Sequence, residues 1–179
     1  MKIAVLGSAF DPPTLGHLDV IKQCLEQFDE VWLVPAFSHA FNKKMRPYFH
    51  RTQMAAALVE DIAIPAVKLV ACEHLITRTS PKAPVYSIDL LDYLKKQHPD
   101  NQYALVIGSD NVKVFDQFYQ AGKLKTDYSP FFAVERVNVR STMVRQAISK
   151  GASIQAYVSP GVANYLRQES LYDGKTTGL

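Results

Sequence analysis

The stretch that decides the fold is residues 7–17, which read GSAFDPPTLGH. An apolar run at residues 3–6 precedes it, and apolar residues at helical spacing follow it at residues 18–28. The run predicts a buried strand and the spacing predicts an amphipathic helix, while the Pro-Pro-Thr triplet is typical of a helix start. Residues 7–17 are therefore expected to form a strand-to-helix turn, the place where a doubly wound sheet binds ligands beyond its strand ends.

The rest of the chain repeats this alternation. Further strands are predicted at 31–34, 67–71, 103–107 and 131–134, and further helices at 54–62, 87–96, 112–118, 141–148 and 162–167. This order predicts an α/β fold, Rossmann-like and doubly wound, with a mainly parallel sheet and helices on both faces. The sequence shows neither a repeat nor a linker, so we expect one domain over residues 1–179, with 173–179 as a flexible tail.

Composition and charge exclude several classes of protein. The 20 Lys and Arg residues against 17 Asp and Glu give a net charge of +3, too small to indicate nucleic-acid binding. Apolar runs are too short for a membrane span or a signal peptide. Cys24 and Cys72 have no metal-ligand spacing and are expected to be buried free thiols, which suit a reducing compartment. We expect a cytoplasmic protein that binds neither nucleic acid nor membrane and has no metal site of its own; the sequence leaves its oligomeric state open.

The turn at residues 7–17 has the features of a phosphate site. Glycine allows close backbone approach, a helix start presents free N–H groups, and His17 in the first helical turn adds a hydrogen-bond donor or a full charge. The alternative is an ordinary turn with a half-exposed histidine. Neither Gly-x-Gly-x-x-Gly nor a Walker loop is present, which excludes the dehydrogenases and kinases that carry those motifs.

Residues 7–17 also resemble the Gly-x-Phe-Asp-Pro-x-His/Thr-x-Gly-His motif of the nucleotidylyltransferase superfamily, which includes nicotinate-nucleotide and phosphopantetheine adenylyltransferases. Three further stretches resemble the nicotinate-nucleotide enzymes in the expected order. Residues 107–110 (IGSD) resemble their Gly-x-Asp element, and residues 140–145 (RSTMVR) resemble their Ile-Ser-Ser-Thr-x-x-Arg helix start. Residues 158–166 (VSPGVANYL) resemble their closing helix. Together the matches extend over nearly the whole chain.

The resemblance implies adenylyl transfer from ATP to nicotinate mononucleotide, giving deamido-NAD and pyrophosphate for NAD biosynthesis, with Mg²⁺ as the family's metal. The attacking phosphate is already anionic at pH 7, so the enzyme mainly aligns two polyanions and neutralises their charge. Thr14 and Arg140 depart from the pyridine-nucleotide pattern. Two alternatives therefore stay open: another acceptor, either nicotinamide mononucleotide or phosphopantetheine, or a nucleotide-binding module without catalysis.

The resemblance also implies roles for individual residues. His17 is expected to contact the α-phosphate, and Arg145 with Thr142 to hold the β- and γ-phosphates, so that His17 and Arg145 carry catalysis. The rest of the predicted ATP site consists of Gly7, Ser8, Phe10, Thr14, Gly108, Asp110 and Ser141. On the acceptor side we expect Lys43 and Arg51 to grip an anion and Ser87 to offer its hydroxyl group. The alternatives are a solvated helical Arg145, an N-capping Asp110 and a basic surface loop around Lys43 and Arg51.

Overall fold

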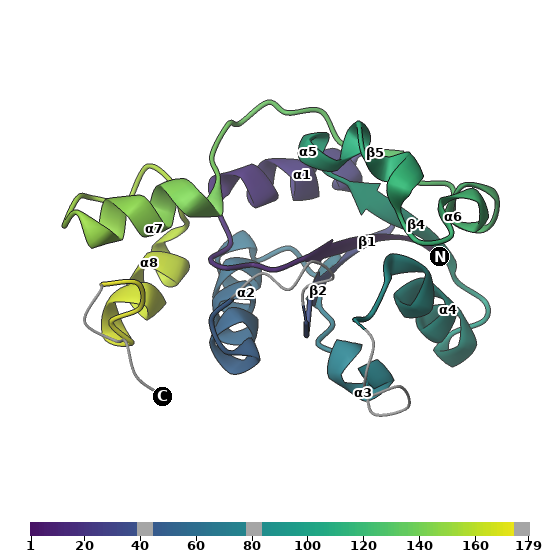
Figure 1. The fold of residues 1–179 in the computed structure, drawn as a ribbon, viewed down its shortest axis with the longest axis horizontal. Coiled ribbons are helices and arrows are strands. Elements are labelled where there is room, and N and C mark those ends of the chain that lie inside the picture. Colours follow the sequence, from purple (N-terminus) through teal and green to yellow (C-terminus); the bar gives the residue numbers. More distant parts are fainter. Residues whose placement is uncertain (39–44, 78–83, 174–179) are drawn as a thin grey trace.

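The computed structural model describes residues 1–38, 45–77 and 84–173. Within them, five strands form one parallel sheet in the order β3-β2-β1-β4-β5 (Figure 1). The strands span Lys2–Ser8 (β1), Glu30–Pro35 (β2), Val67–Leu69 (β3), Gln102–Ile107 (β4) and Phe131–Phe132 (β5). The central strands are continuous apolar runs because helices cover both of their faces.

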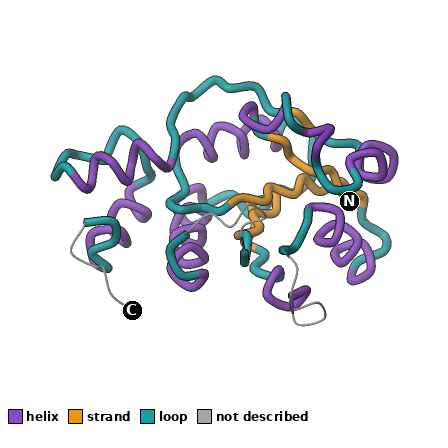
Figure 2. The backbone as a smooth tube through the Cα atoms, viewed as in Figure 1, coloured by secondary structure: helices purple, strands orange, loops and turns teal. Residues whose placement is uncertain are grey.

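Each face of the sheet has its own hydrophobic core. Ala4 and Leu6 of β1 face a cluster built with helices α1 (Leu15–Leu25), α2 (Tyr48–Ile62), α7 (Ser141–Ser149) and α8 (Pro160–Gln168). Ile3 and Val5 point the other way, into a cluster with α4 (Ser87–Gln97), the 3-10 turn η1 (Phe115–Gln117) and α6 (Ala121–Tyr128). Figure 2 shows the strands in the middle of the molecule with helices around them. The predicted doubly wound, mainly parallel fold is confirmed.

Two local predictions are wrong, and one short helix was missed along with α6. The predicted helix at 112–118 is instead a single turn, α5 (Ser109–Val112), followed by η1, because Phe118 is extended and Gln120 adopts a left-handed φ of 53° before α6 begins. The predicted strand at 131–134 ends at Phe132, and the backbone of Val134 pairs with the side-chain amide of Gln23 instead. A five-residue helix, α3 (Glu73–Thr77), was not predicted because it is too short to show a period.

The strand order places the switch point of the doubly wound sheet between β1 and β4, and folds of this kind bind ligands in the crevice beyond the strand ends at that point. The chain leaves β1 for β2 through α1 on one face, and reaches β4 through α4 on the other, so that the carboxyl ends of β1 and β4 flank the point where the winding reverses. The turn at residues 7–17 lies at this point.

Near its carboxyl end the chain returns to this turn. Tyr172 is buried, and its hydroxyl group donates a hydrogen bond to the Asp11 carboxylate. Of the tail predicted at 173–179, residues 174–179 lie outside the described residues. Cys24 and Cys72 are buried free thiols, as predicted. In the described ranges the longest apolar helices fall short of what a membrane crossing needs.

Candidate active site

His17 is held in one tautomer by the start of α1. Thr14 is the N-cap residue, and its backbone N–H donates to Nδ1 of His17 across 3.0 Å. A ring nitrogen that accepts a hydrogen bond carries no proton, so the proton of the neutral imidazole lies on Nε2. Nε2 is 3.1 Å from Oγ of Ser8, the last residue of β1. Burial lowers the pKa of His17 to about 4. His17 is therefore a neutral N–H donor at the strand end, and not the full charge that the sequence also allowed.

The buried side chain of Phe10 packs against the imidazole ring of His17. Phe10 is 1% exposed, and its ring centroid lies 5.0 Å from that of His17. Its backbone takes a left-handed φ of 49°, which turns the ring into the core beneath the imidazole. The Phe10 ring therefore packs against His17 inside the protein, and a contact of Phe10 with ATP, through its backbone, stays a prediction.

The glycines of the turn serve two different purposes. A Cβ atom on Gly7 would meet nothing within 4 Å, so this residue leaves open space at the end of β1. A Cβ atom on Gly16 would lie 2.5 Å from the carbonyl oxygen of Val139. Gly16 therefore makes room for the protein's own backbone rather than for a ligand, a distinction that sequence alone does not carry.

The start of α7 packs directly on this turn, although more than a hundred residues separate the two in sequence. Oγ of Ser141 donates to the Pro12 carbonyl across 2.7 Å, and Nη1 of Arg145 donates to the Asp11 carbonyl across 2.5 Å. Thr142 is exposed at the second position of α7. The structure thus brings the two predicted helix starts together at one opening.

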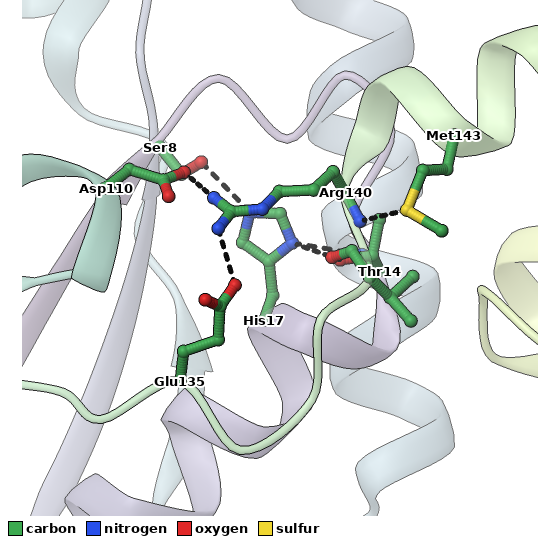
Figure 3. A network of polar contacts seen from close by, with 8 residues as sticks. Ser8, Thr14, His17, Asp110, Glu135, Arg140 and Met143 are labelled. Atoms are coloured by element: carbon green, nitrogen blue, oxygen red, sulfur yellow. Dashed lines mark hydrogen bonds and ion pairs between the residues drawn. The ribbon is translucent and has the colours of Figure 1, made fainter.

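A network of charges extends from α7 to the end of β4. Gly108 is the N-cap residue of α5, and Asp110 in the first turn of α5 forms an ion pair with Arg140. The second arm of the Arg140 guanidinium pairs with Glu135 across 2.5 Å (Figure 3). Arg140 and Glu135 were missing from the predicted site, although the departure from the motif at position 140 was a usable signal.

On the acceptor side, Arg51 is an internal support. It is 1% exposed, and its guanidinium donates to three backbone carbonyl groups: Ala9 at 2.8 Å, Arg46 at 2.9 Å and Phe37 at 3.4 Å. Burial and these three bonds favour the role of an internal support, and a contact of Arg51 with an acceptor anion stays a prediction. Lys43 lies outside the described residues.

Glu73 reinforces the same connection between β2 and α2. It is 5% exposed and accepts a hydrogen bond from the Phe37 backbone N–H across 2.7 Å. Burial raises the pKa of Glu73 to about 7, and the hydrogen bond and the charge of Arg51 oppose that rise.

The start of α4 offers the remaining predicted acceptor residue. Ser87 is its first residue and is half-buried. Beside it, the ring of Tyr86 lies 4.7 Å from the ring of Tyr119, which is 52% exposed. The neighbourhood of Ser87 therefore combines free backbone N–H groups with an accessible pair of aromatic rings.

A resident metal centre does not fit the described part of the chain. No group of three or more His, Cys, Asp or Glu side chains in residues 1–38, 45–77 and 84–173 could hold an ion. Mg²⁺ keeps several waters and is commonly held by substrate phosphates with few protein ligands.

A parallel sheet with two helix starts around the turn after its first strand has the architecture of a nucleotide-binding transferase. The sequence profile of the cytidylyltransferase-like family matches residues 5–147, and the chain belongs to that family. This confirms the resemblance to the nucleotidylyltransferases.

The similar proteins are nicotinate-nucleotide adenylyltransferases. The enzyme of that name from Bacillus subtilis is 26% identical over 193 residues, covering 96% of this chain and 98% of the relative. A crystal structure from Vibrio parahaemolyticus, provisionally assigned the same activity, is 32% identical with a TM-score of 0.81 and covers 93% of this chain and 98% of its own. A Plasmodium falciparum nicotinic acid mononucleotide adenylyltransferase complexed with NaAD is 19% identical with a TM-score of 0.77, covering 96% and 97%. At that identity the likeness concerns the fold.

Proposed function

We propose that the protein joins ATP and nicotinate mononucleotide to give deamido-NAD and pyrophosphate. The observation that carries the proposal is the convergence of the α1 and α7 starts on the open end of β1, where Nε2–H of His17 is fixed as a donor. Full-length similarity to nicotinate-nucleotide adenylyltransferases supports the choice of acceptor.

In this reaction the triphosphate of ATP lies across the opening between the two helix starts. A phosphate oxygen of the acceptor forms a bond to the α-phosphorus, the bond to the oxygen that bridges the α- and β-phosphorus atoms breaks, and pyrophosphate leaves with that electron pair. Nε2–H of His17 donates to the α-phosphate as its charge grows, while Arg145 and Thr142 hold the leaving phosphates. The attacking oxygen is already ionised, so no group needs to remove a proton. A Mg²⁺ ion bound to the ATP phosphates would supply further charge neutralisation.

The acceptor lies on the α4 side of the crevice. A helix start favours a negative group, so the pyridine carboxylate is placed at the backbone N–H groups and hydroxyl of Ser87. The paired rings of Tyr86 and Tyr119 supply a flat apolar surface for the pyridine ring. Nicotinamide mononucleotide lacks the carboxylate charge and gains less from this arrangement.

Pyrophosphate release tests the proposal. The protein is incubated with ATP, Mg²⁺ and, in separate reactions, nicotinate mononucleotide, nicotinamide mononucleotide or phosphopantetheine. We expect the highest kcat/KM with nicotinate mononucleotide. Preference for another acceptor contradicts the substrate assignment, and ATP binding without pyrophosphate release from any acceptor identifies a binding module instead.

A further inference from the structure

The charge network at Arg140 has no place in the reaction described so far. Asp110, Glu135 and Arg140 carry two negative charges and one positive charge, so the network holds a net negative charge beside His17. The two carboxylates disfavour a triphosphate at this place, whereas the guanidinium favours one. This conflict raises the question of what the guanidinium does when ATP is bound.

The backbone position of Arg140 is fixed from both sides. It is the N-cap residue of α7, whose next residue, Ser141, donates to the Pro12 carbonyl. The preceding residue, Val139, accepts a hydrogen bond from Thr14 Oγ1 across 3.1 Å. Farther back, the Gln23 amide bonds both backbone groups of Val134 at 2.8 and 3.0 Å. The segment that carries Glu135 and Arg140 is therefore anchored over α1 at two points.

The side chain of Arg140 crosses the mouth of the proposed ATP site. It starts beside the turn at residues 12–14 and ends at Asp110, directly after β4. Because β4 is the neighbour of β1 in the sheet, a side chain joining these two points spans the carboxyl end of β1, where Ser8 and His17 lie. Figure 3 shows the guanidinium between Asp110 and Glu135 at this place.

The two ion pairs of Arg140 are easily exchanged. The side chains of Arg140 and Glu135 are each 36% exposed and that of Asp110 is 58% exposed, so solvent screens both pairs. Exposed pairs of this kind contribute little to stability. The phosphate oxygens of ATP offer the planar guanidinium a bidentate partner of higher charge than a carboxylate.

We propose that Arg140 is a triphosphate-binding residue that Asp110 and Glu135 hold over the site in the unliganded protein. When ATP binds, the guanidinium exchanges these carboxylates for phosphate oxygens and adds a third cationic or N–H contact to those of His17 and Arg145. The exchange also releases Asp110, which can then accept a hydrogen bond from ribose, as the sequence predicted. This inference rests on the proposed function for its ligand, but ATP binding alone tests it.

Calorimetric titration with MgATP in the absence of acceptor is the experiment. We expect R140A to raise the Kd for MgATP roughly tenfold or more, because a hydrogen-bonded charge contact is lost. R140S, which places the residue of the resembled motif at this position, should bind equally weakly, and R140K should lie between R140S and the wild type. The matched control is R136A, which removes the same charge from the same segment. In the wild type, Arg136 pairs with Glu26 across 3.7 Å and not with Asp110 or Glu135. It should stay within about twofold of the wild type.

A variant of Glu135 shows whether Arg140 binds phosphate or only forms a structural ion pair. If Arg140 binds phosphate, E135Q removes a competitor and leaves the Kd for MgATP unchanged or lower. If E135Q raises the Kd as much as R140A, or if R140A and R136A behave alike, the proposal is overturned. Thermal unfolding of each variant shows that it is folded. Pyrophosphate release by the wild type is measured separately, so failure with nicotinate mononucleotide contradicts the acceptor assignment while the Kd values still decide the role of Arg140.

Discussion

The two sides of the crevice use arginine in opposite ways. On the proposed ATP side, Arg140 and Arg145 are partly exposed, and their guanidinium groups reach Asp110 and the Asp11 carbonyl from a backbone anchored at the turn after β1. On the acceptor side, Arg51 is buried and donates inward to three backbone carbonyl groups. All three residues lie near helix starts beside strand ends, so the sequence context is similar. We therefore expect burial and the number of occupied donors, rather than residue type, to separate a ligand-binding arginine from a structural one.

The largest effect that tests this comparison is expected from Arg51→Ala. The change leaves three carbonyl groups without donors and opens a cavity, so the free energy of unfolding should fall by about 4 kcal/mol. Urea denaturation measures it, with Arg167→Ala on the exposed face of α8 as the control. A small loss of stability together with a large rise in KM for the acceptor would show that Arg51 binds the acceptor, and the difference between the two sides would not hold.

His17→Ala should have the next largest effect, on turnover. Loss of one donor to the developing charge on the α-phosphate should lower kcat on the order of 10²-fold or more. Steady-state pyrophosphate release measures this, and thermal unfolding confirms that the variant is folded. His50→Ala, which removes the hydrogen bond between His50 and Tyr165 of α8, is the matched control. Turnover of His17→Ala at the wild-type rate would remove His17 from the reaction.

The contrast also explains how far sequence reasoning reaches. The fold followed from apolar runs alternating with helical periods, because burial on both faces of a parallel sheet leaves a strong pattern. The convergence of Ser141 and Arg145 on the turn after β1 came from motif order and agrees with the structure. Periodicity failed at 112–118, where aromatic residues reach the core without a continuous helix.

The direction in which a side chain points is not visible in the sequence. Phe10 is turned inward by a left-handed backbone, and Arg51 by carbonyl groups from distant loops. Gly16 is required by the Val139 carbonyl, which lies more than a hundred residues away in sequence. Local sequence states which groups are present at a turn, but their partners come from segments that only the folded chain brings near.

The smallest expected effect separates the two sides by pH. His17 on the ATP side has its pKa lowered to about 4 by burial, and Glu73 on the acceptor side has its pKa raised to about 7 by burial. Between the unfolded and folded pKa values, native His17 binds fewer protons than the unfolded chain, so its contribution to stability is lost as pH falls from about 6.5 towards 4. Native Glu73 binds more protons, so its contribution is complete below about pH 4.5 and is lost as pH rises through about 7.

The two contributions therefore oppose each other, and variants reveal them one at a time. The wild type loses the contribution of Glu73 as pH rises, and Glu73→Gln does not. The free energy of unfolding of Glu73→Gln should therefore rise by about 2 kcal/mol relative to the wild type between about pH 5 and pH 7. The wild type gains stability from His17 as pH rises, and His17→Gln does not. The free energy of unfolding of His17→Gln should therefore fall by a similar amount relative to the wild type over the same interval. Urea unfolding at a series of pH values measures both differences. Curves for the two variants that run parallel to the wild type would mean that neither group is desolvated as the structure describes. If the difference in free energy of unfolding from the wild type changed with pH in the same direction for both variants, the assignment of a neutral base at His17 and a neutral acid at Glu73 would be contradicted.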